Sequence, residues 1–157
     1  MDTLKELRAE TGLSFAQIKK ALDEAAGDKE KARAILATYS EAQAEKKADR
    51  EITAGVIASY VHGSGTIGVL LELGCETDFV AKNEEFVALA RDLAMHVCAM
   101  APTSIEEVEG MDRETALLNQ VFIKNPELTV QKRLDGAVQK FGENTRVTRF
   151  ERYSISA

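Results

Sequence analysis

The sequence contains little of what disulfide-stabilised, membrane-inserted or secreted proteins require. Its 157 residues include two cysteines, Cys75 and Cys98, which form no CxxC pair and are too few for a disulfide framework. No apolar run approaches the ~20 residues that a membrane-spanning helix needs. The N-terminal segment MDTLKELRAE is too charged for a secretory signal. These absences predict a cytoplasmic protein with no membrane partner.

Motifs that bind phosphate groups or support nucleophilic catalysis are also missing. The chain has neither a GxxxxGKS/T loop nor a GxGxxG turn, and it has no nucleophile elbow. Its two histidines, His62 and His96, lie far apart in the sequence without neighbouring ligands, so we interpret both as structural residues rather than zinc ligands. We expect no metal site, no cofactor and no enzymatic activity.

The net charge argues against a nucleic-acid partner. Twenty lysines and arginines stand against 26 aspartates and glutamates, which gives a formal net charge of −6. An excess of negative charge disfavours non-specific binding to phosphate backbones and to anionic membrane surfaces, because like charges repel. We therefore expect no nucleic-acid partner.

Residues 1–40 have the pattern of three short helices, which predicts a mini-domain with a small core. Ser14 and Gln17 have the spacing of a capping box at the start of the second helix, and Asp28 can cap the third. Residues 41–51 are polar and contain neither glycine nor proline. This stretch predicts a helical or semi-flexible linker.

Residues 52–157 change to the patterns of an α+β core. Two apolar, β-branched runs joined by the GSG at residues 63–65 predict a β-hairpin. The segments predicted after it are a long helix from Asn83, shorter helices over 112–122 and 129–141, and a last strand over 144–155. The last strand completes a three-stranded antiparallel sheet. The predicted fold class is α+β, with a three-helix domain before the core.

The segment CETDFVAKNEEF, residues 75–86, places Asp78 and Phe79 between the second predicted strand and the long predicted helix. Large apolar residues at such joints are usually core. Phe79 lies seven residues before Phe86, so a helix that began early would place both on one apolar face. Thr77 and Asp78 have equally ordinary interpretations as helix caps. The residue types alone favour a structural role for this segment.

Two stretches nevertheless resemble the signature sequences of the elongation factor Ts family. They are LRAETGLSFAQIKKAL, residues 7–22, and ELGCETDFVAKNEEF, residues 72–86. Further matches follow in the family's order: KKADRE, LAMHV, LLNQVFIKNP, GENTRV and RFERY. The family usually has a longer helical segment before LLNQ, and often a second copy of the core subdomain. About ten residues, TSIEEVEGMD, stand here instead, so the chain is identified as a shortened member.

The resemblance implies a ubiquitin-associated-like (UBA-like) domain over residues 1–40, an α+β core over 52–157, and nucleotide exchange on the translational GTPase elongation factor Tu. It assigns a binding segment that displaces Mg²⁺ from the GTPase to Thr77, Asp78, Phe79 and Val80. It assigns docking on the GTPase to Arg8, Phe15 and Ala16. Other members often carry methionines at the last two of these positions, so the character of that contact can differ.

The predicted strands carry apolar residues on both faces of the sheet. Each face therefore needs a helix, a second sheet or another chain packed against it. The long helix from Asn83 can cover one face. The resemblance suggests that a second protomer covers the other in a homodimer, in place of the second subdomain of longer relatives. The alternative is cover from within the same chain by Leu117, Leu118, Val121 and Leu134.

Other classes of function stay open at this point. Three-helix mini-domains also occur as peptide- or ubiquitin-binding modules, which would have no exchange activity. A small ribosome-associated structural protein is a further alternative, although the acidic net charge is unfavourable for RNA contact. Neither alternative explains the TDFV stretch in the core.

Overall fold

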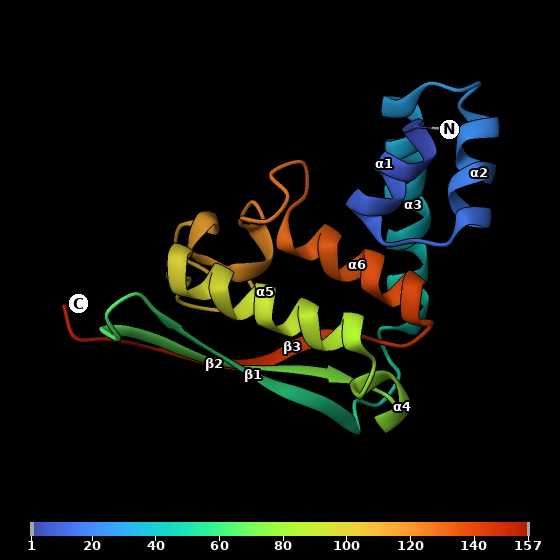
Figure 1. Cartoon of the computed structure of the whole chain (residues 1–157). Coiled ribbons are helices and arrows are strands. Elements are labelled where there is room, and N and C mark those ends of the chain that lie inside the picture. The colour runs from blue at the N-terminus through green and yellow to red at the C-terminus, as the bar shows by residue number, and fades with distance from the viewer. Residues whose placement is uncertain (1, 157) are drawn as a thin grey trace.

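Three N-terminal helices enclose a small hydrophobic core. The computed structural model describes residues 2–156, and its first elements are α1 (Asp2–Thr11), α2 (Phe15–Glu24) and α3 (Lys29–Lys47). They group together at the upper right of Figure 1. Their buried apolar side chains are Leu7, Leu13, Ile18, Ala21, Ala25, Ala32 and Leu36. Because few side chains are buried, this unit gains only a modest hydrophobic stabilisation of its own.

The predicted caps begin α2 and α3. The Ser14 hydroxyl accepts a hydrogen bond from the backbone N–H of Gln17 (3.3 Å), and the Gln17 side chain accepts one from the N–H of Ser14 (3.0 Å). The Asp28 carboxylate accepts a hydrogen bond from the N–H of Lys31 (3.0 Å). These contacts satisfy backbone donors that a helix leaves unpaired in its first turn. The capping box and the Asp28 cap are therefore confirmed.

Helix α3 is longer than the predicted third helix and contains most of the predicted linker. It continues to Lys47, so the boundary expected at residue 40 falls inside a helix. Its second half lies against α6 (Val130–Phe141), where the Ser40 hydroxyl donates to the Gln139 side chain. Near its end, the Lys47 ammonium donates to the carbonyl oxygen of Gly142 (3.0 Å). One continuous helix therefore contributes both to the N-terminal unit and to the core.

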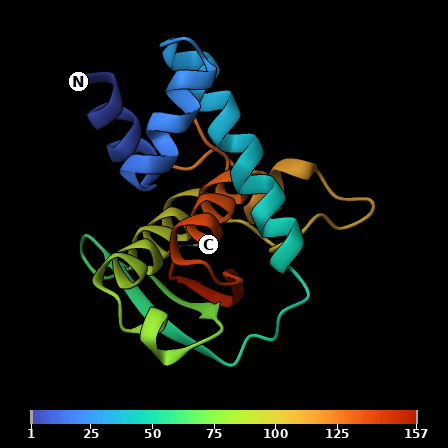
Figure 2. The ribbon, with the colours of Figure 1, turned by 90° about the vertical axis from the view of Figure 1, so that its right-hand side faces the viewer.

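The remainder of the chain forms one antiparallel sheet with helices on one face. The strands β1 (Ala54–His62), β2 (Ile67–Cys75) and β3 (Arg146–Ser154) pair in the order β1-β2-β3. This arrangement confirms the predicted α+β class and the three-stranded sheet. Helix α5 (Glu84–Met100) lies on the sheet, with α6 on the same side (Figures 1 and 2). Phe86 of α5 meets Phe141 of α6 edge to face, with ring centroids 5.6 Å apart.

The helix predicted over residues 112–122 is wrong. That stretch forms two 3₁₀ turns, η1 (Arg113–Thr115) and η2 (Leu117–Asn119). The backbone N–H groups of Leu117 and Leu118 donate to the carbonyl oxygens of Ser104 and Ile105, at 2.8 and 3.1 Å. An α-helix would need those donors for carbonyls four positions earlier. Because a neighbouring segment takes them, only tight turns can form here.

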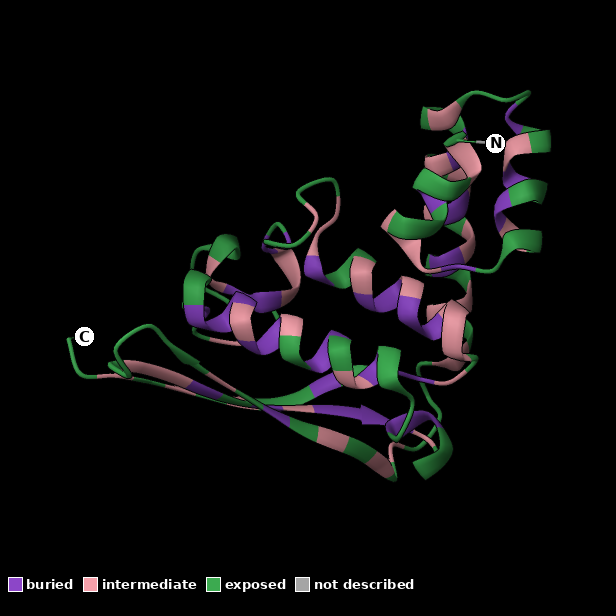
Figure 3. Cartoon of the chain, in the orientation of Figure 1, coloured by how far each residue is buried: buried purple, intermediate pink, exposed green. Residues whose placement is uncertain are grey.

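The sheet face opposite α5 stays open to solvent among residues 2–156. Figure 3 shows exposed positions along the strands, and Leu70, in the central strand, is 51% exposed. Other exposed apolar side chains on this face are Ile57, Val61 and Tyr153. The alternative of cover from within the chain is wrong, because Leu117 and Leu134 are buried in the main core, Leu118 packs against that core, and Val121 is exposed. We call this set of exposed residues the open sheet face.

Candidate functional site

The TDFV segment forms a one-turn helix, α4 (Asp78–Ala81), between β2 and α5. Thr77 is its N-cap, since the Thr77 hydroxyl accepts a hydrogen bond from the N–H of Val80 (3.4 Å). The cap interpretation therefore holds for Thr77, whereas Asp78 is the first helical residue. Figure 1 shows α4 at the end of the sheet away from the tip of the β1–β2 hairpin, and in both Figures 1 and 2 it lies at the bottom of the view while α1 and α2 lie at the top.

Two of the four residues of α4 are exposed to solvent and two are buried in the core. Phe79 is 87% exposed and Asp78 is also exposed, while Val80 and Ala81 are buried in the main core. The interpretation of Phe79 as a core residue is therefore wrong. Val80 instead anchors the turn from within. A large apolar side chain held this far out of the protein is available for burial by a partner.

A carboxylate that is distant in sequence holds the chain at the start of α4. Glu143 accepts hydrogen bonds from the backbone N–H groups of Glu76 and Thr77 (3.1 and 3.0 Å) and from the Thr77 hydroxyl (2.7 Å). Sequence reasoning missed Glu143 and Glu76 as contributors to this site. The only signal for Glu143 was its position in the GENTRV match.

Cys75, which precedes α4, is a structural thiol. It is buried and donates a hydrogen bond to the carbonyl oxygen of Thr77 (3.3 Å). Burial raises the pKa of the Cys75 thiol, and the nearby Glu143 carboxylate raises it further. A thiol that stays protonated is a poor nucleophile and a poor metal ligand. The contact of Cys75 with Thr77 therefore serves the conformation of this segment.

The predicted docking residues lie on the N-terminal helices. Arg8 and Ala16 are exposed, and Phe15 is 48% exposed. Arg8 and Phe15 line an open cleft of about 910 Å³ whose opposite side includes Asp92 and Arg133 of the core. The lining of this cleft does not include α4. The structure thus keeps the two predicted groups apart, with α1 and α2 at the top and α4 at the bottom of Figures 1 and 2 and no pocket that joins them.

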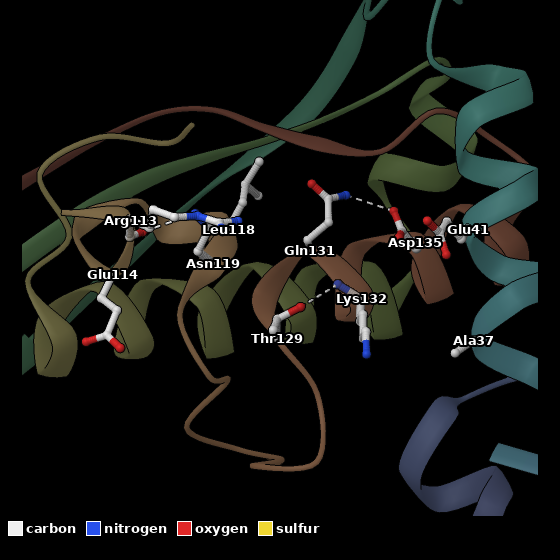
Figure 4. A pocket seen from close by; sticks show the side chains of 10 residues that line it. All are labelled: Ala37, Glu41, Arg113, Glu114, Leu118, Asn119, Thr129, Gln131, Lys132 and Asp135. Atoms are coloured by element: carbon white, nitrogen blue, oxygen red, sulfur yellow. Dashed lines mark hydrogen bonds between the residues drawn. The ribbon is translucent and has the colours of Figure 1, made fainter. Parts of the chain in front are cut away.

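A second pocket lies between α3 and α6, apart from both groups (Figure 4). It encloses about 540 Å³ next to Asp135, which accepts a hydrogen bond from the Gln131 side chain (2.8 Å). Burial raises the pKa of the Asp135 carboxyl, the bond from Gln131 opposes this shift, and the Glu41 carboxylate adds to it. Arg113 and Lys132 also line the pocket. This mixture of charges selects no ion of either sign.

Neither histidine contributes to a metal site. His96 is buried, its Nδ1 accepts a hydrogen bond from the N–H of Ile123 (3.2 Å), and its Nε2 lies 2.9 Å from the side-chain oxygen Oε1 of Gln120. Burial lowers the pKa of His96, and the Gln120 contact partly offsets this. His62 is exposed on the hairpin. Over residues 2–156, no group of three or more His, Cys, Asp or Glu side chains could hold a metal ion.

Comparison with known proteins gives one consistent family. The family described as "Elongation factor TS" matches residues 5–109. A protein named elongation factor Ts from Carboxydothermus hydrogenoformans is 40% identical, over 97% of this chain and 87% of that protein. The protein of the same name from Thermotoga maritima is 41% identical, over 99% of this chain and 95% of that protein. The one from Desulfotalea psychrophila is 38% identical, over 98% and 96%.

These relatives carry residues that this chain lacks. The alignment with the Carboxydothermus protein runs over 188 positions, which exceeds the 157 residues of the chain.

Among the residues that the structure describes, no helix is both long enough and apolar enough to span a membrane.

Proposed function

The chain belongs to the elongation factor Ts family, which acts in translation elongation, and from this premise we propose that it accelerates the release of GDP from elongation factor Tu. The observation that carries this proposal is Phe79, a phenylalanine 87% exposed on a turn whose next two residues are buried. In this role the protein catalyses no covalent chemistry and needs no cofactor of its own. Its partner is the GTPase, first bound to GDP and then free of nucleotide.

An exchange factor works by binding one state of its partner better than another. Bound GDP is held by backbone N–H groups around its phosphates and by Mg²⁺, which requires nearly ideal octahedral geometry. A factor that prefers the nucleotide-free GTPase weakens GDP binding by the same ratio, because coupling between two binding sites is reciprocal. The factor therefore need not touch the nucleotide.

In our proposal, the Thr77–Val80 segment supplies this preference. Phe79 enters a pocket between helices of the GTPase that opens only when those helices shift away from the Mg²⁺ site. Burial of a phenylalanine side chain stabilises such a complex by about 1.5–3 kcal/mol. Asp78, exposed beside Phe79, competes for hydrogen bonds that hold the water ligands of the metal. Val80, buried in the core, contributes by anchoring the turn.

The N-terminal helices supply affinity in this proposal. Arg8, Phe15 and Ala16 dock on the GTPase domain, and their exposure on α1 and α2 leaves them accessible. Because they are covalently joined to α4 through the core, docking raises the local concentration of Phe79 at its target. The loss of docking should therefore affect the concentration dependence of exchange more than its maximal rate.

We further propose that two chains associate through the open sheet face. Leu70 in the central strand is exposed, as are its apolar neighbours on the same face of the two edge strands. Two such faces packed at the ~10 Å spacing of a β-sandwich would remove them from water. A two-fold homodimer would present two exchange sites to two GTPases.

Stopped-flow release of a fluorescent GDP analogue from elongation factor Tu tests the exchange function. The protein should increase the release rate in a saturable manner at millimolar Mg²⁺. In excess EDTA the acceleration should become smaller, because chelation already removes the metal that the factor displaces. Binding without any acceleration would contradict the proposal and favour a binding module without exchange activity.

A further inference from the structure

The loop between α6 and β3 is joined to the start of α4 by reciprocal side-chain to backbone contacts. Glu143 accepts three hydrogen bonds from Glu76 and Thr77, at distances from 2.7 to 3.1 Å. In return, the Glu76 carboxylate accepts a hydrogen bond from the backbone N–H of Asn144 (2.6 Å). We call Glu76, Glu143 and Asn144 the clip. Glu76 lies 67 and 68 positions before the other two members, which are adjacent in the sequence.

The clip fixes the direction of the Thr77 hydroxyl. This hydroxyl donates its only proton to Glu143 (2.7 Å), so its lone pairs are left to accept the N–H of Val80 (3.4 Å). A hydroxyl without such an acceptor can rotate and lose its capping geometry. A helix of one turn cannot sustain itself, because nucleation is unfavourable. The conformation of α4 therefore depends on the clip and on the burial of Val80 and Ala81.

The same clip contacts the chain that leaves the N-terminal helices. The Asn144 side chain is buried and donates to the carbonyl oxygens of Ala48 (3.3 Å) and Arg50 (2.8 Å), directly after the end of α3. The Arg50 guanidinium lies 3.7 Å from the Glu76 carboxylate. One polar network, in which Asn144 is buried, therefore fixes α4 relative to the helix that carries the N-terminal unit.

We propose that Glu143 is a positioning residue for nucleotide exchange, acting through Thr77 to hold Phe79 outward before the partner arrives. This proposal rests on the exchange function proposed above. An ordered turn loses little conformational entropy when Phe79 is buried by the partner, so binding is stronger than with a disordered segment. The remaining contacts of the clip fix the separation between Phe79 and the docking residues of the N-terminal helices.

The variants Glu143→Ala and Glu143→Gln test this role. The glutamine keeps one acceptor oxygen for the backbone N–H groups but cannot accept the Thr77 proton at its amide nitrogen. Glu107→Ala is the matched control, because Glu107 also accepts contacts from two residues, Arg113 and Asn119 at 2.8 Å, in a loop distant from α4 in the sequence.

The first measurement uses amide hydrogen exchange on the protein alone. Glu143→Ala should reduce the protection of the Val80 amide about fivefold, the effect expected from the loss of one helix cap. Glu143→Gln should give a smaller reduction, and Glu107→Ala should give none. Unchanged protection of Val80 in Glu143→Ala would overturn the proposal that the clip orders α4.

The second measurement is catalysed GDP release in a double-mutant cycle with Phe79→Ala. Glu143→Ala alone should slow release about fivefold with the melting temperature of the sheet core little changed. If Glu143 acts through Phe79, adding Glu143→Ala to Phe79→Ala should cause no further loss. A double variant slowed by the product of the two single effects would overturn the positioning role. If the wild-type protein releases no GDP, the exchange function itself fails, while the amide measurement still decides whether the clip orders α4.

Discussion

Phe79→Ala separates the binding function of the α4 turn from its structural role. Because the Phe79 side chain is 87% exposed, the small buried remainder contributes only about 0.3 kcal/mol to folding, at about 2 kcal/mol for complete burial. The melting temperature should therefore fall by about 1 °C. In the complex, the partner buries the exposed part, and the loss of the remaining ~1.7 kcal/mol should slow catalysed GDP release ~20-fold.

The comparison variant for this prediction is Phe86→Ala. Phe86 is fully buried and packs against Phe141, so its truncation should destabilise the fold by about 3–5 kcal/mol. Both variants are assayed by thermal melting and by stopped-flow release of fluorescent GDP over a range of protein concentrations. If Phe79→Ala melts as early as Phe86→Ala, then Phe79 supports the fold. If it is stable but releases GDP at the wild-type rate, the role of Phe79 in exchange is refuted.

Three further predictions follow from the docking residues, the open sheet face and the buried carboxyl. Arg8→Ala combined with Phe15→Ala should raise the concentration for half-maximal GDP release about tenfold and leave the maximal rate unchanged; a lower maximal rate would contradict a docking role. Light scattering at micromolar concentration should give a mass near twice that of one chain for the wild type and near one chain for Leu70→Glu; a single-chain mass for the wild type would exclude the homodimer. Burial raises the pKa of Asp135 in the folded state. Between the unfolded-state pKa of ~3.9 and this raised pKa, the folded state binds more protons than the unfolded state, so the free energy of unfolding falls as pH rises. Asp135→Asn, which keeps an acceptor for Gln131, should therefore melt higher than the wild type at pH 7 but not below pH ~3.9; an equal difference at both values would contradict this cause.

Local sequence predicted those elements whose ends are set by local contacts. The Ser14–Gln17 capping box lies within four consecutive residues, and Asn83 caps α5 through the N–H of Glu85 (2.8 Å). Residues 112–122 were predicted wrongly because the donors of Leu117 and Leu118 bind a different segment. Periodicity cannot reveal such a partner, since it reports only which side chains share a face.

The candidate site was predictable in identity but not in geometry. Thr77 to Val80 and the docking residues were named through the family resemblance, whereas the residue types alone favoured a structural role. The opposite burial of Phe79 and Val80, adjacent in sequence, follows from where α4 begins, which is set by the Thr77 cap. That cap depends in turn on Glu143, which is 66 positions away from Thr77. No pattern within a short window contains this information.

The continuity of α3 constrains how the length of the chain can change. A flexible linker tolerates insertions of any size, but each residue added to an α-helix rotates what precedes it by about 100° and shifts it by about 1.5 Å. One residue inserted between Ser40 and Lys47, both of which contact the α6 region, would rotate Arg8 and Phe15 about the α3 axis relative to the core that carries α4. Only insertions close to whole helical turns, about 3.6 residues or multiples of this, would keep the direction in which Arg8 and Phe15 point relative to α4. Helix α3 thus sets both the angle and the distance between the N-terminal docking residues and α4. Insertions and deletions should therefore be far less tolerated in α3 than in the loops.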